Sequence, residues 1–202
     1  LKGDGGEDWL IGGDGNDQLW GGDGGDVLDG GIGDDTFYPG PGDDLIQGGE
    51  QRNVYWLQDR PGDRDTIIYS SVTDGGIQIN LTAARVNGPA SVGTDTYRGI
   101  EWIVGTASGD TVLGRLGALP DPIAQHGLGF QGNGGSDLID QDNYGNEPWF
   151  NGVSVAYSWS STPITATFSG ASGKVSYEQF TNTQTGQVLQ QAGTDQLVRA
   201  TQ

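Results

Sequence analysis

The sequence contains no cysteine, so no disulfide can hold this chain together. In a reducing compartment that absence is unremarkable, but small secreted domains usually depend on such cross-links. Outside the cell, a chain without them needs another source of stability. Hydrophobic residues make up only 33% of the sequence, which is little material for a globular core. Both shortages favour a fold with a narrow interior and a stabilising element besides apolar packing.

Basic residues and long apolar runs are also scarce. Nine Lys and Arg stand against 27 Asp and Glu, and the net charge is −18. Binding to nucleic-acid phosphates requires clustered basic residues, so the composition excludes that partner. No apolar run approaches the roughly 18 residues of a membrane-spanning helix. No serine lies in a G-x-S-x-G motif, and GNGGSD at 132–137 lacks the lysine of a phosphate-binding loop.

Glycine, by contrast, is abundant, with 38 residues, and in the first quarter of the chain it is periodic. Five nine-residue blocks read GDGGEDWLI (3–11), GGDGNDQLW (12–20), GGDGGDVLD (21–29), GGIGDDTFY (30–38) and PGPGDDLIQ (39–47). Position 6 is always aspartate: Asp8, Asp17, Asp26, Asp35 and Asp44. Position 8 is always large and apolar: Leu10, Leu19, Leu28, Phe37 and Ile46. A fixed period indicates one structural unit per block, each stacked on the next.

Elementary stereochemistry suggests what each block does. Glycines at positions 1, 2 and 4 allow backbone angles closed to other residues, so the first six residues are predicted to form a tight turn. The last three are predicted to be extended, with position 8 facing one way and positions 7 and 9 the other. A repeated turn and strand builds a parallel coil with position 8 as its thin core. Such turns align carbonyl and carboxylate oxygens, the hard ligands that calcium prefers.

The blocks resemble the calcium-binding nonapeptide of the repeats-in-toxin (RTX) family. The resemblance implies an all-β fold, a parallel β-roll or right-handed parallel β-helix solenoid with a short irregular β extension. It also implies several Ca²⁺ ions, each shared between turns two blocks apart on one edge. One edge would carry Asp8, Asp26 and Asp44, and the other Asp17 and Asp35. The predicted metal-site residues are Asp8, Gly13, Gly15, Asp17, Gly22, Gly24, Asp26, Gly31, Gly33, Asp35, Gly40, Gly42, Asp44 and Asp137.

Charge supports a cation at these turns. Residues 1–50 hold thirteen acids and one base, Lys2. Same-edge turns should lie about 4.8 Å apart, where two unit charges repel by about 0.9 kcal/mol even in water. Divalent ions reverse the sign of that interaction. The alternative interpretation is that Asp and Gly serve here only as ordinary turn formers.

After residue 47 the repeat decays. GGEQRNVYW (48–56) has Asn53 at position 6, which indicates a closing rung, with ion occupancy fading towards Trp56. Short strands are predicted at 66–70, 76–82, 96–105 and 110–114, because these segments are β-branched or aromatic and end in turn residues. No segment shows the 3.6-residue apolar period of a helix. The segments 93–114 and 69–81 resemble the strand-rich region that often follows RTX blocks.

The nonapeptide phase then returns twice. GTASGDTVL (105–113) places Asp110 at position 6 and Val112 at position 8, and GNGGSDLID (132–140) places Asp137 and Ile139 there. Neither acid has a matching acid two blocks away, so we expect weak calcium binding or none at these turns. Strands at 153–158 and 163–169 echo 69–81, and GTDQL (193–197) echoes GTDTY (93–97). We predict three units: a calcium-binding RTX roll (1–56), a strand-rich extension (57–131) and a second, incomplete RTX-type unit (132–202).

Aromatic and apolar residues also line the predicted outer faces. Position 9 of alternate blocks reads Trp20, Tyr38 and Trp56. Rungs about 4.8 Å apart would stack these rings on one another, so packing is favoured over a sugar-binding platform. The other face carries Trp9, Ile11, Val27 and Leu45. Apolar patches on both faces suggest that the roll is covered or that it assembles with other copies or surface proteins.

Two remaining features are interpreted as structural. His126 is the one histidine, and beside Ala124, Gly127 and Leu128 it is expected to be a loop or packing residue. The Asp121–Pro122 bond is of the kind at which some RTX-bearing proteins cleave themselves, but its surroundings do not resemble that module. A surface turn is expected there.

The functional expectation is a calcium-binding structural module, not an enzyme, that folds when calcium binds outside the cell. The chain begins inside the repeat pattern, so we expect a fragment of a larger protein. RTX proteins are usually exported by type I secretion, which implies an extracellular or cell-surface location, as in an S-layer or adhesin-type scaffold. The alternatives are an accessory module of a secreted protease, lipase or epimerase, and a module that binds glycans or ice.

Overall fold

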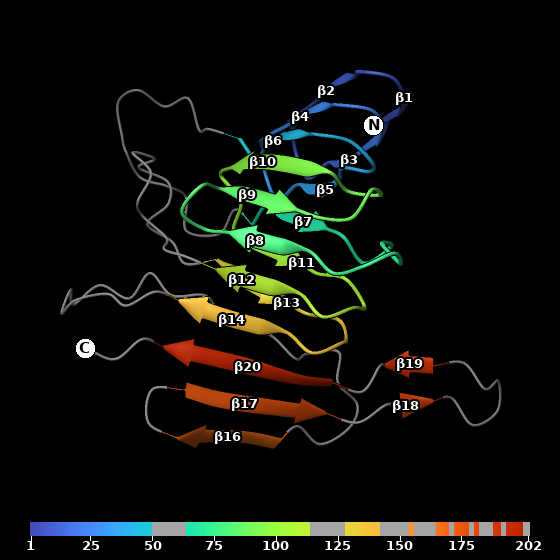
Figure 1. The fold of residues 1–202 in the computed structure, drawn as a ribbon. Coiled ribbons are helices and arrows are strands. Elements are labelled where there is room, and N and C mark those ends of the chain that lie inside the picture. Colours follow the sequence, from blue (N-terminus) through green and yellow to red (C-terminus); the bar gives the residue numbers. More distant parts are fainter. Residues whose placement is uncertain are drawn as a thin grey trace, which may run out of the picture.

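The computed structural model describes residues 1–49, 64–113 and 128–141, and beyond these the backbone of the strands within 154–199. Every regular element in these parts is a β-strand, and none is a helix. The strands form one stack that runs from the blue N-terminal strands to the red C-terminal ones (Figure 1). A seven-stranded sheet, here sheet A, and an eleven-stranded sheet, here sheet B, make up the stack. The predicted all-β fold with parallel strands is confirmed.

The two sheets share the strands of each coil between them. Sheet A is parallel throughout and contains, in spatial order, β1 (Lys2–Gly5), β3 (Gln18–Asp23), β5 (Thr36–Tyr38), β7 (Thr66–Ile68), β11 (Trp102–Val104), β13 (Gly129–Gln131) and β15 (Ser154–Val155). Sheet B contains β2 (Trp9–Asp14), β4 (Val27–Ile32), β6 (Leu45–Gln47), β10 (Thr94–Arg98), β9 (Arg85–Asn87), β8 (Gln78–Asn80), β12 (Thr111–Leu113), β14 (Leu138–Gln141), β20 (Gly193–Arg199), β17 (Ser172–Tyr177) and β16 (Thr165–Ser169). A separate hairpin pairs β18 (Phe180–Thr181) with β19 (Val188–Gln190).

One coil of the roll is two nonapeptide blocks long. Consecutive strands of the chain alternate between the sheets, so each strand pairs with the next but one. Trp9 pairs with Val27, and Val27 pairs with Leu45, at a constant offset of two blocks. Position 6 therefore recurs at the same place on the same edge in every second block, as the sequence predicts.

Position 8 forms the core. Leu19, Leu28, Phe37 and Ile46 have no exposed surface, and Leu10, at the open end of the stack, is 7% exposed. Burying one such side chain contributes about 1.5–3 kcal/mol. The core continues into later coils through Tyr97 of β10 and through the central residues of the three-residue strands, among them Ile67, Ile79, Ile103, Val112 and Phe130. The core predicted from the repeat thus extends well past it.

The extension differs from the roll in sheet B. There β8, β9 and β10 form an antiparallel meander between β6 and β12, and β9 is a strand that the sequence did not predict. The expected single strand at 96–105 is wrong. It breaks at Gly99, which has a left-handed φ of 59°, into β10 of sheet B and β11 of sheet A. The chain crosses from one sheet to the other at that glycine.

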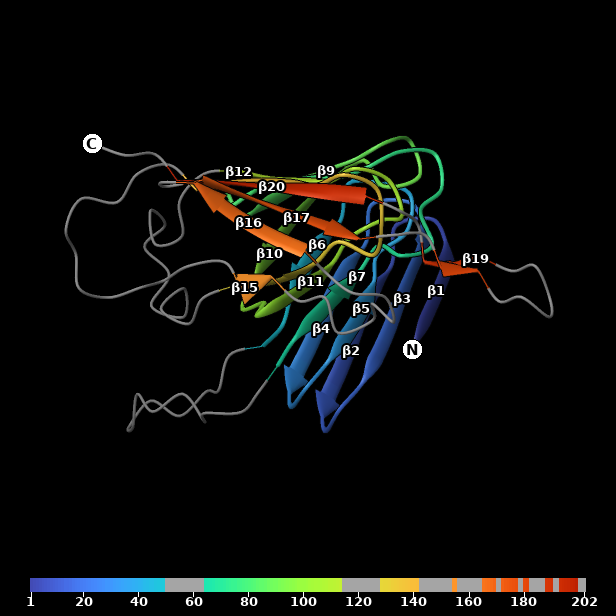
Figure 2. The same ribbon diagram turned by 90° about the horizontal axis from the view of Figure 1, so that it is seen from below.

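Both long sheets continue through the proposed unit boundaries. β14 adds to β12 in sheet B, and β15 adds to β13 in sheet A. Figure 2 views the same stack from the end that carries β16 and β17. The division into three units stays a prediction. No helix in the described part of the chain is long and apolar enough to cross a membrane.

Candidate metal centre

The turns between the sheets lie on two edges of the roll. Edge 1 turns lead from sheet A to sheet B, and edge 2 turns lead from sheet B to sheet A. Each described turn that keeps its acid places it just before the next strand. On edge 1 these acids are Asp8, Asp26, Asp44, Asp110 and Asp137. Asp95, the second residue of β10, follows a hairpin within sheet B but lies on the same edge, beside Asp44. On edge 2 they are Asp17, Asp35, Asp65 and Glu101.

Each acid is joined to its neighbour on the same edge. The N–H of Asp8 donates to Oδ1 of Asp26, and the N–H of Asp26 donates to Oδ1 of Asp44, both at 2.8 Å. Edge 2 repeats the arrangement, because the N–H of Asp17 donates to Oδ1 of Asp35 at 2.8 Å. These bonds form a ladder in which each carboxylate accepts the backbone N–H of the acid in the coil before it. The ladder brings the predicted site aspartates together on the two predicted edges.

In the first three acids of edge 1, the second carboxylate oxygen differs from the first. Oδ2 of Asp8, Asp26 and Asp44 is buried and accepts no hydrogen bond from the described part of the chain. Asp26 is only 1% exposed and Asp44 only 2%. A buried ionised oxygen without a partner is costly, and the cost is removed when a cation or donor binds it. These oxygens therefore form a column of acceptors that the protein itself leaves unsatisfied.

Burial also changes the protonation of Asp44. Desolvation raises the pKa of Asp44 to about 7, and the neighbouring charges of Asp26 and Asp43 act in the same direction. The hydrogen bond with the N–H of Asp26 opposes this shift but does not cancel it. Without a cation, the fold thus favours the neutral carboxylic acid of Asp44 at pH values below about 7. A cation at the column would restore the ordinary preference for the charged form.

The turn glycines bring backbone carbonyls close to the ladder. Gly22 and Gly24 have φ values of 112° and 131°, a region that other residues avoid. A Cβ at either position would collide with the carbonyl oxygen of Asp4 or Gly6 in the coil before. The same pattern repeats along both edges at Gly31, Gly33, Gly40 and Gly42.

Position 1 needs glycine for another reason. These glycines do not have the left-handed angles that the sequence reasoning assigned to them, and that part of the prediction is wrong. A Cβ at Gly21 would instead lie 2.5 Å from Oδ2 of Asp26 and would collide with the carbonyl oxygen of Pro39. Close approach of the acid, rather than a strained backbone, excludes a side chain there.

A second ladder runs in the opposite direction at position 5. The N–H of Asp34 donates to Oδ1 of Asn16 at 3.1 Å, and the N–H of Arg64 donates to Oδ1 of Asp34 at 2.9 Å. On edge 1, the N–H of Thr94 donates to Oδ1 of Asp43 at 2.8 Å. Adjacent turns are thus joined by two side-chain bridges of opposite direction. This geometry identifies Arg64 and Thr94 as position-5 residues in turns that have lost the repeat sequence.

Three ladder acids were missed from the sequence. Oδ1 of Asp65 accepts from the N–H of Asp35 at 2.8 Å, and Oδ1 of Asp95 accepts from that of Asp44 at 3.1 Å. Oε2 of Glu101 in turn accepts from the N–H of Asp65 at 2.8 Å. The one sequence feature that these turns keep from the repeat is an acid followed by a short strand with an apolar residue inside it, as in Asp-Thr-Ile-Ile at 65–68. Asn53, the expected closing position, lies outside the described residues, and Asp65 provides the next rung of edge 2.

The expectation that Asp110 and Asp137 lack partners is wrong. The N–H of Asp110 donates to Oδ1 of Asp137 at 2.8 Å. The two acids lie on adjacent coils because Leu138 pairs with Thr111. The intervening coil contains 27 residues rather than 18, since Asp110 and Asp137 are 27 positions apart. The longer coil hid this pairing from a search for a constant period.

The ligand set that these turns offer is mostly backbone. No three acidic or histidine side chains converge on one point in the described residues. Calcium takes six to eight oxygen ligands and accepts backbone carbonyls among them. Two ladder carboxylates and the carbonyls of the adjacent glycine turns are oxygen donors only. The donor chemistry fits calcium and does not fit a metal that prefers nitrogen or sulfur.

The comparison with known families agrees with this chemistry. The model of the RTX calcium-binding nonapeptide repeat, in four copies, matches residues 2–37 and 31–56. The chain carries RTX repeats. They make its N-terminal part a calcium-binding module. No curated protein matches the chain.

The other candidate sites are resolved only in part. Trp20 and Tyr38 stack with their ring centroids 4.9 Å apart and their planes at 3°, as expected for packing between rungs of the RTX roll. Trp56, His126 and the Asp121–Pro122 bond lie outside the described residues. The glycine-rich turn at 132–137 leads into the strand β14, so it is not the loop of a phosphate-binding helix.

Proposed function

We propose that the RTX turns hold several calcium ions in two columns, one along each edge. On edge 1 the ligands are the carboxylates of Asp8, Asp26 and Asp44, and on edge 2 those of Asp17, Asp35 and the newly found Asp65. Carbonyls of the adjacent turns complete each site, which requires glycine at Gly13, Gly15, Gly22, Gly24, Gly31, Gly33, Gly40 and Gly42. The unsatisfied Oδ2 oxygens of the buried edge 1 acids are the single observation that carries this proposal.

Calcium binding is then coupled to folding. The ligands come together only when coils stack, so the free energy of binding becomes free energy of folding. Calcium-binding modules outside cells typically bind at about 10⁻⁴ to 10⁻³ M. Calcium supplies positive charge between carboxylates that otherwise repel one another. The first coils would stay unfolded where calcium is scarce and fold where it is plentiful.

The ligand assignment is tested by a matched pair of variants. Asp26→Asn and Asp29→Asn each remove one negative charge, and the two residues belong to one block. The amide of the first can still accept the N–H of Asp8, but it replaces Oδ2 with an NH₂ group. Calcium titration of both full-length variants should show weaker binding or a lower stoichiometry only for Asp26→Asn. Equal loss in both variants would contradict a specific role for the buried oxygen.

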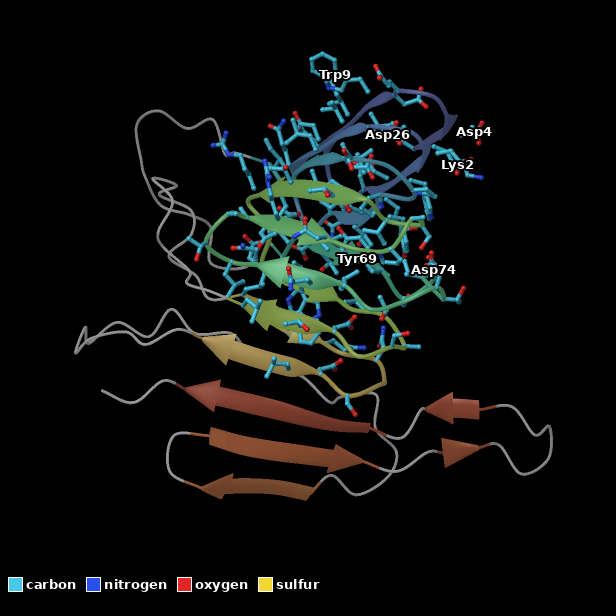
Figure 3. All side chains as sticks on the ribbon, viewed as in Figure 1. Lys2, Asp4, Trp9, Asp26, Tyr69 and Asp74 are labelled. Atoms are coloured by element: carbon cyan, nitrogen blue, oxygen red, sulfur yellow. The ribbon has the colours of Figure 1, made fainter. Side chains whose placement is uncertain are left out.

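We further infer a structural role in a secreted or cell-surface protein, such as an S-layer or adhesin-type scaffold. A stack in which each coil contacts its neighbours extends by adding repeats. The open end of this stack exposes Trp9, Ile11 and Leu1, with Trp9 75% exposed (Figure 3). The flanking gene sequence tests this role. Further repeats would support a scaffold, whereas a protease or lipase motif would make the module an accessory of a secreted enzyme.

A further inference from the structure

The position-1 residues form a column along edge 1 beside the ladder acids. In turns of full length, the Cα of this residue lies against the carboxylate of its own turn. A Cβ at Gly3 would lie 2.7 Å from Oδ2 of Asp8, and one at Gly21 would lie 2.5 Å from Oδ2 of Asp26. Because Thr36 pairs with Thr66, the same column continues from Pro39 to Tyr69. Tyr69 is thus a large side chain in a column whose other members are Gly3, Gly21, Pro39, Gly105 and Gly132.

Tyr69 points into the stack and reaches an acid of another strand. Its hydroxyl donates to Oδ2 of Asp95 at 2.6 Å, and both residues are buried. Asp95 arrives through the β9–β10 hairpin, so it does not follow a six-residue glycine turn. Its Oδ1 still accepts the N–H of Asp44, as in every ladder rung. The hydroxyl therefore occupies the oxygen that Asp8, Asp26 and Asp44 leave unsatisfied.

At Asp110, the next acid along edge 1, the donor to the carboxylate is a threonine instead of a tyrosine. In the turn of Asp110, position 2 is Thr106, which is fully buried. Its N–H donates to Oδ2 of Asp110 at 2.8 Å, and its Oγ1 donates to Oδ1 at 2.9 Å. The N–H of Ile77 donates to Oδ1 at 2.8 Å. The carboxylate of Asp110 is thus held by donors of the protein alone.

We propose that Tyr69 and Thr106 replace calcium on edge 1 in the middle coils, so that the edge 1 column of ions is interrupted after Asp44 and the coils of Asp95 and Asp110 fold without metal on that edge. This inference rests on the proposed function, in which the unsatisfied oxygens of the first coils bind calcium. It divides one continuous stack into a metal-dependent N-terminal part and a metal-independent middle part. Tyr69 and Thr106 decide where the division lies, because they determine which buried acids are open to a cation.

Hydrogen exchange of backbone amides in the full-length chain tests the division. In chelator, amides of β2 and β4 should exchange rapidly, while amides of β8, β10, β11 and β12 stay protected. Added calcium should protect both groups. Equal loss of protection in both groups in chelator would overturn the inference while leaving calcium binding intact. If calcium changed neither group, the proposed function itself would fail, so the two failures are distinguishable.

Tyr69→Phe isolates the role of the hydroxyl. The variant keeps the buried ring and leaves Oδ2 of Asp95 without a donor. In chelator, protection in β8 and β10 should fall roughly tenfold to a hundredfold, the effect of one unsatisfied buried group, and calcium should restore it. Tyr97→Phe is the matched control, since Tyr97 is also buried and its hydroxyl has no hydrogen-bond partner in the described residues. Its protection should stay at the wild-type level.

Every outcome for Tyr69→Phe decides the matter. Wild-type protection in chelator would show that the hydroxyl is not needed, and would overturn its assigned role. If protection fell and calcium failed to restore it, a cation could not take the place of the Tyr69 hydroxyl. That result would overturn the proposal that the hydroxyl and calcium are alternative partners of the carboxylate. Thr106→Val gives an independent reading at Asp110. It removes only the Oγ1 donor, so loss should be smaller and confined to β8 and β12, and a loss spread over the whole stack would contradict a local role.

Discussion

Gly48 and Asp65 are positions 1 and 6 of one turn, although residues 50–63 stand between them in the sequence. A Cβ at Gly48 would collide with Oδ2 of Asp65, as one at Gly30 would with Oδ2 of Asp35. The N–H of Gly31 donates to the carbonyl of Gly48, so this glycine keeps its place in the edge 2 column. The repeat therefore continues through an inserted segment that conceals it from a search for a fixed period.

The inserted segment should accordingly be dispensable for the roll. Replacing residues 50–63 with Asp-Gly, the residues at positions 3 and 4 of the second block, would restore a six-residue turn from Gly48 to Asp65. Shortening this connection should cost little, because loop closure depends weakly on length. The unfolding midpoint in calcium should move by less than about 4 °C, the shift that about 1 kcal/mol causes in a chain of this size. Loss of cooperative unfolding would show that Gly48 and Asp65 do not form one turn.

Position 1 should not accept a methyl group. Gly21→Ala places a Cβ against both Oδ2 of Asp26 and the carbonyl of Pro39, so the turns must move apart. We expect a loss of about 2 kcal/mol or more in the free energy of unfolding, within the usual cost of overpacking. Gly5→Ala is the control, since its Cβ would lie 3.8 Å from its nearest neighbours in Asp23. Chemical denaturation in calcium measures both, and equal losses would refute the close approach.

Acid should stabilise the metal-free fold. Burial raises the pKa of Asp44 to about 7 and that of Asp95 to about 8, from a usual value of 3.8. A carboxyl with a raised pKa in the fold contributes stability that is present below its unfolded pKa and is lost as pH rises through its folded pKa. In chelator, thermal stability should therefore fall between about pH 4 and pH 8. With calcium the trend should reverse, because the ligand acids must be ionised, and parallel profiles with and without calcium would contradict this account.

The stacked rings should stabilise the roll without taking part in calcium binding. Trp20→Ala removes the partner of Tyr38, and such pairs contribute about 0.5–1.5 kcal/mol beyond their buried area. We expect a modest fall in the unfolding midpoint and an unchanged calcium affinity per folded chain. A variant that keeps wild-type stability but loses binding to a glycan would instead support a ligand platform.

The sequence predicted those features of the fold that recur in every uninterrupted nine-residue block. Five blocks were enough to assign the coil length, the core at Leu19 and Phe37, and the two acid columns, because the same contacts recur at a constant offset. The period could not find Asp95 or Glu101. The turn before Glu101 is shortened to Gly99, Ile100 and Glu101, and Asp95 follows a hairpin, so neither keeps the glycines that mark a full turn.

The partner of Asp95 could not have been predicted at all. Tyr69 directly follows β7 of sheet A, whereas Asp95 is the second residue of β10 in sheet B. The two residues meet because the meander of β8, β9 and β10 places β10 at this point of the stack. The burial of their hydroxyl and carboxylate is a property of that packing, not of any local pattern. The contact between Thr106 and Asp110 is easier to predict from the sequence, because both residues belong to one turn that has the length of the repeat.

Far-ultraviolet circular dichroism of the full-length chain measures whether the coils that carry the buried carboxylates of Asp8, Asp26 and Asp44 need calcium in order to fold. At neutral pH in chelator, the β signal should be lower than in calcium because the first coils are unfolded, and titrated calcium should raise it cooperatively together with the unfolding midpoint. Magnesium at the same concentration is the control, because its smaller octahedral site fits these turns poorly. A spectrum and midpoint that stay the same in chelator and in calcium would contradict the account.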